Sequence, residues 1–243
     1  MVNVSYDLHI HSCLSPCGDN NMTPANIAGM AAVKGLDAVA LTDHNTARNC
    51  APFMAYCEAY GIIGIPGLEI NTAEEVHAVC LFRSLEAALD FDAYVYEHLL
   101  KVPNNERIFG AQILMNDDEE ETGREPNLLI NATDIAFDDV WGLVRERDGV
   151  MVPAHIDKSA NSLLGQLGFI PDGSLFKTVE VKDLKKLHEL KRNHPYVNEC
   201  QIISDSDAHY LDAVHDNSLT LLCEHKTIDG VIDALLRGPL YEN

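Results

Sequence analysis

Histidine and carboxylate side chains recur in this chain where strand-like apolar runs begin or end. The positions are His9, His11, His44, Glu69, His77, His155, Asp207 and His209. Imidazole nitrogens and carboxylate oxygens together suit borderline divalent cations such as Zn²⁺, Mn²⁺ and Fe²⁺. A single histidine or acid at such a position is more often structural than a ligand. The prediction of a metal centre therefore depends on the combination.

His9 and His11 form the clearest pair because they lie two residues apart in an extended segment. Side chains at this spacing project from the same face of a strand, so both imidazoles can hold one cation. Asp7 shares that face and could accept a proton from a ligand imidazole, or could form an ordinary salt bridge. Asp207 and His209 repeat the spacing near the other end of the chain.

Two further candidates follow buried runs. Asp43 and His44 come after residues 38–41, which deliver His44 to a strand end and make Asp43 an orienting group or an additional ligand. Glu69 comes after residues 62–65, and the two oxygens of its carboxylate could bridge two cations. By itself, Glu69 would be read as a helix cap or a surface acid.

Two basic residues are candidate substrate contacts. Lys158 follows His155 by three positions, and Arg48 follows His44 by four. Both residues would lie on loops that face the mouth of the barrel site, where either side chain could bind a phosphate or a distal anion. Exposed basic side chains usually contact only solvent, which is the simpler interpretation for both.

The elements that must position these residues alternate between strands and helices. Strands are predicted at 4–10, 38–41, 61–65, 76–82, 150–154, 178–181, 201–204 and 219–222. Helices are predicted at 24–34, 47–60, 84–101 and 227–236. This alternation favours a parallel α/β architecture. In a parallel barrel the carboxyl ends of the strands meet, and catalytic groups distant in sequence converge there.

One large domain of 243 residues is expected, with 47% hydrophobic residues available for its core. Residues 103–133 are the least regular part and could form an insertion over one end of the barrel. The acidic run 117–121 within it is predicted to be a solvated loop.

The charge balance limits the partners of the chain. Its net charge of −21 disfavours an extended nucleic-acid surface. The 7 cysteines are scattered and form no CxxC pair, as is typical of reduced thiols in a cytoplasmic protein. No apolar run approaches the roughly 20 residues that span a bilayer, so no membrane partner is expected.

The motifs together resemble the PHP superfamily, named for its polymerases and histidinol phosphatases. They are the HIH triplet that starts at His9, the TDH that ends at His44, the GLE that ends at Glu69, His77, the AH that ends at His155 and the SDAH that ends at His209. The resemblance extends from Tyr6 to His209. It implies an α/β fold, a distorted TIM-like (β/α)7 barrel, with two or three divalent cations.

The resemblance also implies how the ligands are shared. It assigns His9, His11, Glu69 and Asp207 to a first cation, Glu69, His77 and His155 to a second, and His44 and His209 to a third. The family usually places a histidine or aspartate shortly after the HxH motif to complete the third site, and this sequence has Pro16 and Cys17 there. Either Cys17 or Asp19 substitutes as a ligand, or the third site is weak.

These assignments predict a mechanism. A hydroxide that bridges the first two cations would attack phosphorus, and His44 or His209 would protonate the leaving group. Asp43 and Asp205 would support the ligands from behind.

The sequence favours a metal-dependent phosphoesterase, a phosphatase or phosphodiesterase, whose partner is a small-molecule phosphate ester. One alternative is a nuclease that trims single-stranded ends. Another is a regulatory module with a vestigial metal site.

Overall fold

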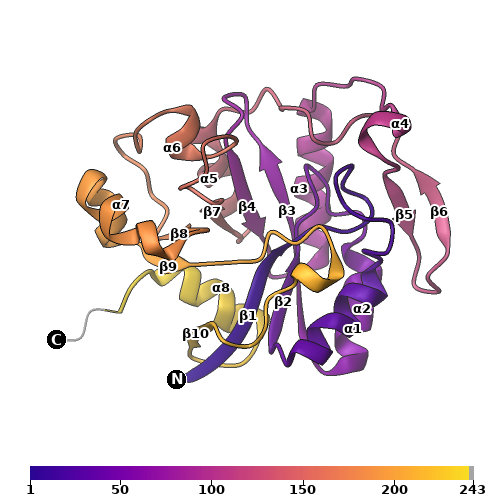
Figure 1. The fold of residues 1–243 in the computed structure, drawn as a ribbon, viewed down its shortest axis with the longest axis horizontal. Coiled ribbons are helices and arrows are strands. Elements are labelled where there is room, and N and C mark those ends of the chain that lie inside the picture. Colours follow the sequence, from indigo (N-terminus) through magenta and orange to yellow (C-terminus); the bar gives the residue numbers. More distant parts are fainter. Residues whose placement is uncertain (241–243) are drawn as a thin grey trace.

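The computed structural model describes residues 1–240, and its centre is a six-stranded sheet that curls into a half-barrel with helices around it (Figure 1). The strand order is β10, β1, β2, β3, β4, β7, and β8 and β9 form a separate pair. The bounds are β1 Val2–Ile10, β2 Ala38–Leu41, β3 Ile63–Asn71, β4 His77–Leu81, β7 Val150–Pro153, β8 Thr178–Glu180, β9 Gln201–Ile203 and β10 Thr220–Cys223. Each predicted strand is present, and the TIM-like α/β fold is confirmed.

The strand directions differ from the parallel arrangement that the sequence predicted. β1, β2 and β3 are parallel, but β4 runs antiparallel to β3 and to β7. Only residues 72–76 connect β3 to β4, whereas a parallel crossover needs about a dozen residues or more. β3 continues beyond residue 65 to Asn71, because residues 67–71 pair with β4. The reversal brings His77, the first residue of β4, beside the carboxyl end of β3.

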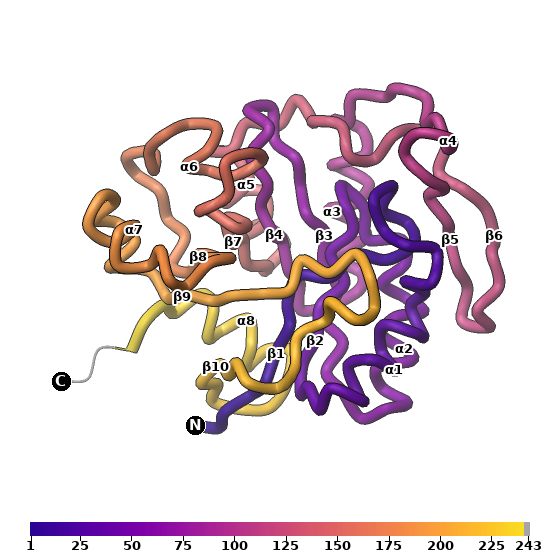
Figure 2. The backbone as a smooth tube through the Cα atoms, viewed as in Figure 1, coloured from indigo at the N-terminus to yellow at the C-terminus, as the bar shows by residue number. Residues whose placement is uncertain are grey.

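The β8–β9 pair continues the circle beyond β7. A backbone hydrogen bond of 2.9 Å from Ile156 to Glu180 joins the exit of β7 to β8. Another, of 3.0 Å from His11 to Ala208, joins the exit of β1 to the segment after β9. Figure 2 shows this orange-to-yellow segment crossing in front of β1. The HxH motif and the Asp207 motif therefore meet although they lie at opposite ends of the sequence.

Helices cover the sheet. They are α1 Pro24–Lys34, α2 Cys50–Tyr60, α3 Leu85–His98, α5 Phe137–Arg145, α6 Leu163–Gln166, α7 Leu187–Asn193 and α8 Ile228–Arg237. α1 has its predicted limits, because the Thr23 hydroxyl accepts a hydrogen bond from the Asn26 amide and Gly35 ends the helix at a φ of 74°. α5, α6 and α7 were not predicted. Within residues 1–240, no helix combines the length and apolar character required to cross a membrane.

Apolar side chains pack on both faces of the curled sheet. In β2, Val39 and Leu41 belong to one buried cluster, and Ala38 and Ala40 belong to another, which includes Val231 of α8. Alternate residues of a strand point to opposite faces. Both faces of this strand are therefore covered, which explains its uninterrupted apolar sequence.

The segment 103–133 contains α4 (Glu106–Phe109) and an antiparallel hairpin of β5 (Ile113–Met115) and β6 (Glu121–Arg124), at the right of Figure 1. It is more regular than the sequence indicated, and its acidic run is exposed as predicted.

Asn45 ties the end of this segment to the barrel. Its Nδ2 atom donates hydrogen bonds of 2.7 Å to the Leu129 carbonyl and 2.9 Å to the Asn131 carbonyl, and its Oδ1 atom accepts one of 2.9 Å from the Asn71 amide. Its φ of 53° lies in the left-handed region, which asparagine tolerates better than most residues.

Replacement of Asn45 by alanine should lower the free energy of unfolding by about 2–4 kcal/mol, because buried partners lose their hydrogen bonds and the left-handed backbone becomes strained. Equilibrium unfolding in urea measures this change. Asn20→Ala, at an exposed position, is the matched control. A loss no larger than that of the control would contradict the anchoring role.

Candidate metal centre

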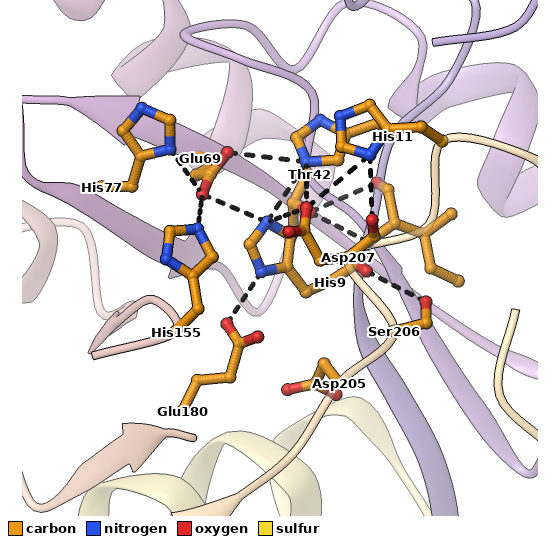
Figure 3. A network of polar contacts seen from close by, with 12 residues as sticks. His9, His11, Thr42, Glu69, His77, His155, Glu180, Asp205, Ser206 and Asp207 are labelled. Atoms are coloured by element: carbon orange, nitrogen blue, oxygen red, sulfur yellow. Dashed lines mark hydrogen bonds and ion pairs between the residues drawn. The ribbon is translucent and has the colours of Figure 1, made fainter. Parts of the chain in front are cut away.

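The predicted ligands converge at the end of the barrel where β1, β2 and β3 finish (Figure 3). They surround a cavity of about 340 Å³, called the metal cavity here. It is lined by Cys17, His44, Glu69, His77, Ile130, His155, Lys158, Ala160, Asn161, Asp207 and His209. His9 and His11 lie behind this lining and are fully buried.

Glu69 is the centre of the cluster. Its carboxylate is fully buried on β3. The Oε1 atom lies 2.9 Å from His77 Nδ1, 3.2 Å from His155 Nε2 and 3.2 Å from His9 Nε2. Each of these imidazoles comes from or follows a different strand, so the barrel itself brings them to one oxygen.

The second oxygen of Glu69 faces another pair of imidazoles. Its Oε2 atom lies 2.9 Å from His44 Nδ1 and 3.5 Å from His11 Nε2. Asp207 approaches from the opposite side, with Oδ1 3.3 Å from His11 Nε2 and 3.6 Å from His9 Nε2. Both acids thus lie next to the imidazoles of the HxH pair.

The donor atoms fit divalent cations. Three groups have ligand atoms within 4.8 Å of one another: His9, His11 and Glu69; His44, Glu69 and His77; His11, His44 and His209. Glu69 Oε2 and His44 Nδ1 are buried and close, yet neither has a hydrogen-bond partner. Facing nitrogens and carboxylate oxygens that lack hydrogen bonds are the arrangement that a cation satisfies.

The grouping differs from the assignment that the resemblance implied. His44 lies with Glu69 and His77 as well as with His209. His155 reaches Glu69 but belongs to none of the three compact groups. The division of ligands between individual cations stays a prediction.

The pKa values reflect burial and charge together. Burial alone would lower the pKa of His9, but Glu180, Glu69 and Asp207 outweigh it and raise that pKa well above its usual value. Burial likewise would raise the pKa of Glu69, but the neighbouring imidazoles, led by His77, bring it well below normal. Glu69 is therefore ionised, as a metal ligand must be.

Glu180 orients His9 from behind, a role that sequence reasoning missed. Its Oε2 atom lies 2.8 Å from His9 Nδ1, which leaves Nε2 to face the other ligands (Figure 3). Asp7, the residue predicted for such a role, instead accepts hydrogen bonds from the Ser206 and His215 amides, so that prediction is corrected. The acid within the apolar run 178–181 was the available signal.

Asp43 acts on the ligands through Ser15. The Ser15 hydroxyl donates a 2.6 Å hydrogen bond to Asp43 Oδ1 and lies 3.0 Å from His11 Nδ1. Asp43 therefore orients His11 through the serine and does not line the cavity. Asp205 is equally remote, since its carboxylate accepts a 2.6 Å hydrogen bond from the Leu8 amide.

Two of the predicted ligands have unusual backbone conformations. His155 has a φ of 31° and Asp207 a φ of 50°, both in the left-handed region. Such conformations are costly for non-glycine residues and cluster at functional sites, where the surrounding structure enforces them. Here they turn side chains that follow β7 and β9 toward Glu69.

The structure distinguishes between Cys17 and Asp19, the two alternative ligands of the third site. Cys17 lines the metal cavity beside His44 and His209. Asp19 does not, because its carboxylate accepts hydrogen bonds of 2.8 Å from the backbone and side chain of Asn21. Of the two, only Cys17 lies where it can contribute a donor.

The predicted substrate contacts also differ in placement. Lys158 lines the metal cavity, and its ammonium pairs with Asp207. Arg48 is not among the lining residues. Its guanidinium pairs with Glu125 at 2.7 Å and lies over the Tyr96 ring, so the structure does not bring it to the cavity.

A comparison with protein families agrees with this geometry, because the model of the PHP domain matches residues 7–237. The chain belongs to the PHP domain family. Family membership, together with the histidine and glutamate clusters, supports metal-dependent hydrolysis. An uncharacterized protein of Methanocaldococcus jannaschii is 37% identical over 76 residues, which cover 28% of this chain and 44% of that protein.

Solved structures share the fold at low identity. A lesion-specific endonuclease of Pyrococcus furiosus has a TM-score of 0.63 at 19% identity and covers 97% of this PHP domain, which spans 56% of that endonuclease chain. A candidate metal-dependent phosphoesterase of Bifidobacterium adolescentis also has a TM-score of 0.63 at 19% identity, over 96% of both chains. An amidohydrolase of Chromobacterium violaceum has a TM-score of 0.56 at 17% identity, over 84% of this chain and 87% of its own.

Removal of the Glu69 charge should disrupt metal binding by this PHP domain. In Glu69→Gln we expect the affinity for the tightest divalent cation to fall by about 100-fold or more, since an anionic ligand at the centre of the cluster is lost. Calorimetric titration with elemental analysis measures it. Glu58→Gln, at an exposed position of α2, should bind like the parent. Equal affinities would exclude Glu69 as a ligand.

The orienting role of Glu180 predicts a smaller effect. Glu180→Gln should weaken metal binding by roughly 10–100-fold, because a neutral amide supports the His9 imidazole less well than a carboxylate. The same titration applies, with the exposed Glu199→Gln as control. Unchanged affinity in Glu180→Gln would show that its contact with His9 is only structural.

Proposed function

We propose that this PHP domain is a metal-dependent phosphoesterase that acts on a small-molecule phosphate ester. The observation that carries the proposal is the convergence of five imidazoles on the two oxygens of the buried Glu69. Two or three divalent cations, Zn²⁺, Mn²⁺ or Fe²⁺, would be held there. When bound, they would polarise phosphoryl oxygens and lower the pKa of a water molecule.

The side chains around the cavity have complementary roles in this proposal. Lys158 lies at the wall with its side chain 39% exposed, and its ammonium can neutralise a non-bridging oxygen of the ester. His209 is 23% exposed, the most accessible imidazole of the cluster, and is suited to protonate the leaving group. His44 is almost fully buried and is the alternative donor.

Size and charge favour a small substrate. A cavity of about 340 Å³ is at the lower end of the range usual for small-molecule sites. The net charge of −21 repels polyanions at long range.

A nuclease is the second candidate. Endonuclease Q, in complex with a duplex carrying an abasic lesion, has a TM-score of 0.62 to this chain at 18% identity. A protein of the same fold thus binds DNA. The comparisons therefore do not support the expectation that this chain lacks a nucleic-acid surface.

A panel of phosphomonoesters, phosphodiesters and oligonucleotides, assayed with each cation, tests the proposal. We expect phosphate release from at least one small ester, and at least a 100-fold loss of kcat/KM in Glu69→Ala. Glu58→Ala is the control. Hydrolysis of oligonucleotides alone would favour the nuclease. Full metal content without hydrolysis of any ester would favour a regulatory module.

A further inference from the structure

A second hollow of about 450 Å³ adjoins the metal cavity. It lies between the loops that follow β7 and β8 and is lined by Asp157, Lys158, Ser159, Ala160, Lys182, Asp183 and Lys186. We call it the lysine hollow. Lys158 and Ala160 line both spaces, so one wall is common to the two.

The two carboxylates of the lysine hollow accept hydrogen bonds from backbone amides. Asp157 accepts hydrogen bonds of 2.7 Å from the Lys182 amide and 2.9 Å from the Asp183 amide. Asp183 in turn accepts one of 3.1 Å from the Lys185 amide. These contacts fold the loop after β8 and leave neither acid paired with a lysine ammonium of the hollow.

Lysines outnumber aspartates in this lining by three to two. Lys158 pairs with Asp207 at the common wall, and Lys182 donates to the carbonyls of Asp205 and Ser206. Within residues 1–240, Lys186 forms neither a side-chain hydrogen bond nor an ion pair. Among the described residues, Lys186 is therefore an ammonium that can bind an anion, next to two aspartates whose oxygens face backbone amides.

We propose that the lysine hollow binds a second phosphate of the substrate, carried by the leaving group of the ester that enters the metal cavity. The proposal rests on the proposed function and narrows the substrate class to esters with a distal phosphate. Lys158 would lie between the two phosphates, with Lys182 and Lys186 on the distal one. An ammonium binds phosphate as a compact charge with several donors.

Two sources of a distal phosphate are distinguished by kinetics. Glucose 1,6-bisphosphate is compared with glucose 1-phosphate, and a dinucleotide with a 5′-phosphate is compared with its unphosphorylated form. The doubly phosphorylated member of at least one pair should have a kcat/KM higher by roughly tenfold. Lys186→Ala should reduce that preference about fivefold, and Lys186→Glu should abolish it. The pair that responds identifies the source.

Lys185→Ala is the matched control, because Lys185 is the exposed neighbour of Lys186 and does not line the hollow. It should retain the parental preference. Equal effects of the two alanine variants, or an equal effect of Lys186→Ala on both members of a pair, would overturn the proposal.

A binding measurement separates this proposal from the proposed function. Alkyl phosphonates contain carbon–phosphorus bonds, so a hydrolase of phosphate esters does not cleave them. Metal-loaded protein, titrated calorimetrically, should bind propane-1,3-bisphosphonate more tightly than propylphosphonate by roughly tenfold. Lys186→Glu should remove the difference. If binding follows this pattern and no ester is hydrolysed, the phosphate site in the lysine hollow is supported and the phosphoesterase activity is rejected. Equal binding of the two ligands rejects only the phosphate site in the lysine hollow.

Discussion

The interaction on which this structure depends is that of one buried carboxylate with the imidazoles that surround it. Glu69 is fully buried, and an unpaired carboxylate in that position would be strongly destabilising. Five histidines from different parts of the chain face its two oxygens. A charge of this kind requires partners at fixed positions, and most of the irregular features of the fold serve to supply them.

The reversal of β4 is the first of these features. It places His77 opposite Asn71 at the carboxyl end of β3, two residues beyond Glu69. The crossing of the chain after β9 is the second, because it brings Asp207 to the end of β1. The left-handed backbones of His155 and Asp207 are the third. The left-handed backbones would be a cost in a purely structural barrel, and all three features bring donor atoms close to one another.

A layer behind the ligands holds them in orientation. Glu180 fixes the ring of His9, and the Asp43–Ser15 pair fixes the ring of His11. At the mouth, the adjoining lysine hollow is lined by Lys158, Lys182 and Lys186 together with Asp157 and Asp183. Under the proposal for this hollow, its lysines would position an anion beside the metal cavity.

The amino-acid sequence determined the strands, the limits of α1 and the set of candidate ligands, because apolar periodicity, the Thr23 cap and motifs such as HIH are local. It predicted neither the antiparallel β4 nor α5, α6 and α7, and it offered Asp7, as one of two alternatives, for the imidazole contact that Glu180 makes. These features depend on which segments meet in space, and the acceptor behind His9 lies 171 positions away in the sequence. The same holds for Arg48, whose pairing with Glu125 is set by where the segment 103–133 packs. Local sequence motifs thus indicated the donor residues. Only the tertiary structure decided which of them share an oxygen, because that depends on distances between strands and not along the chain.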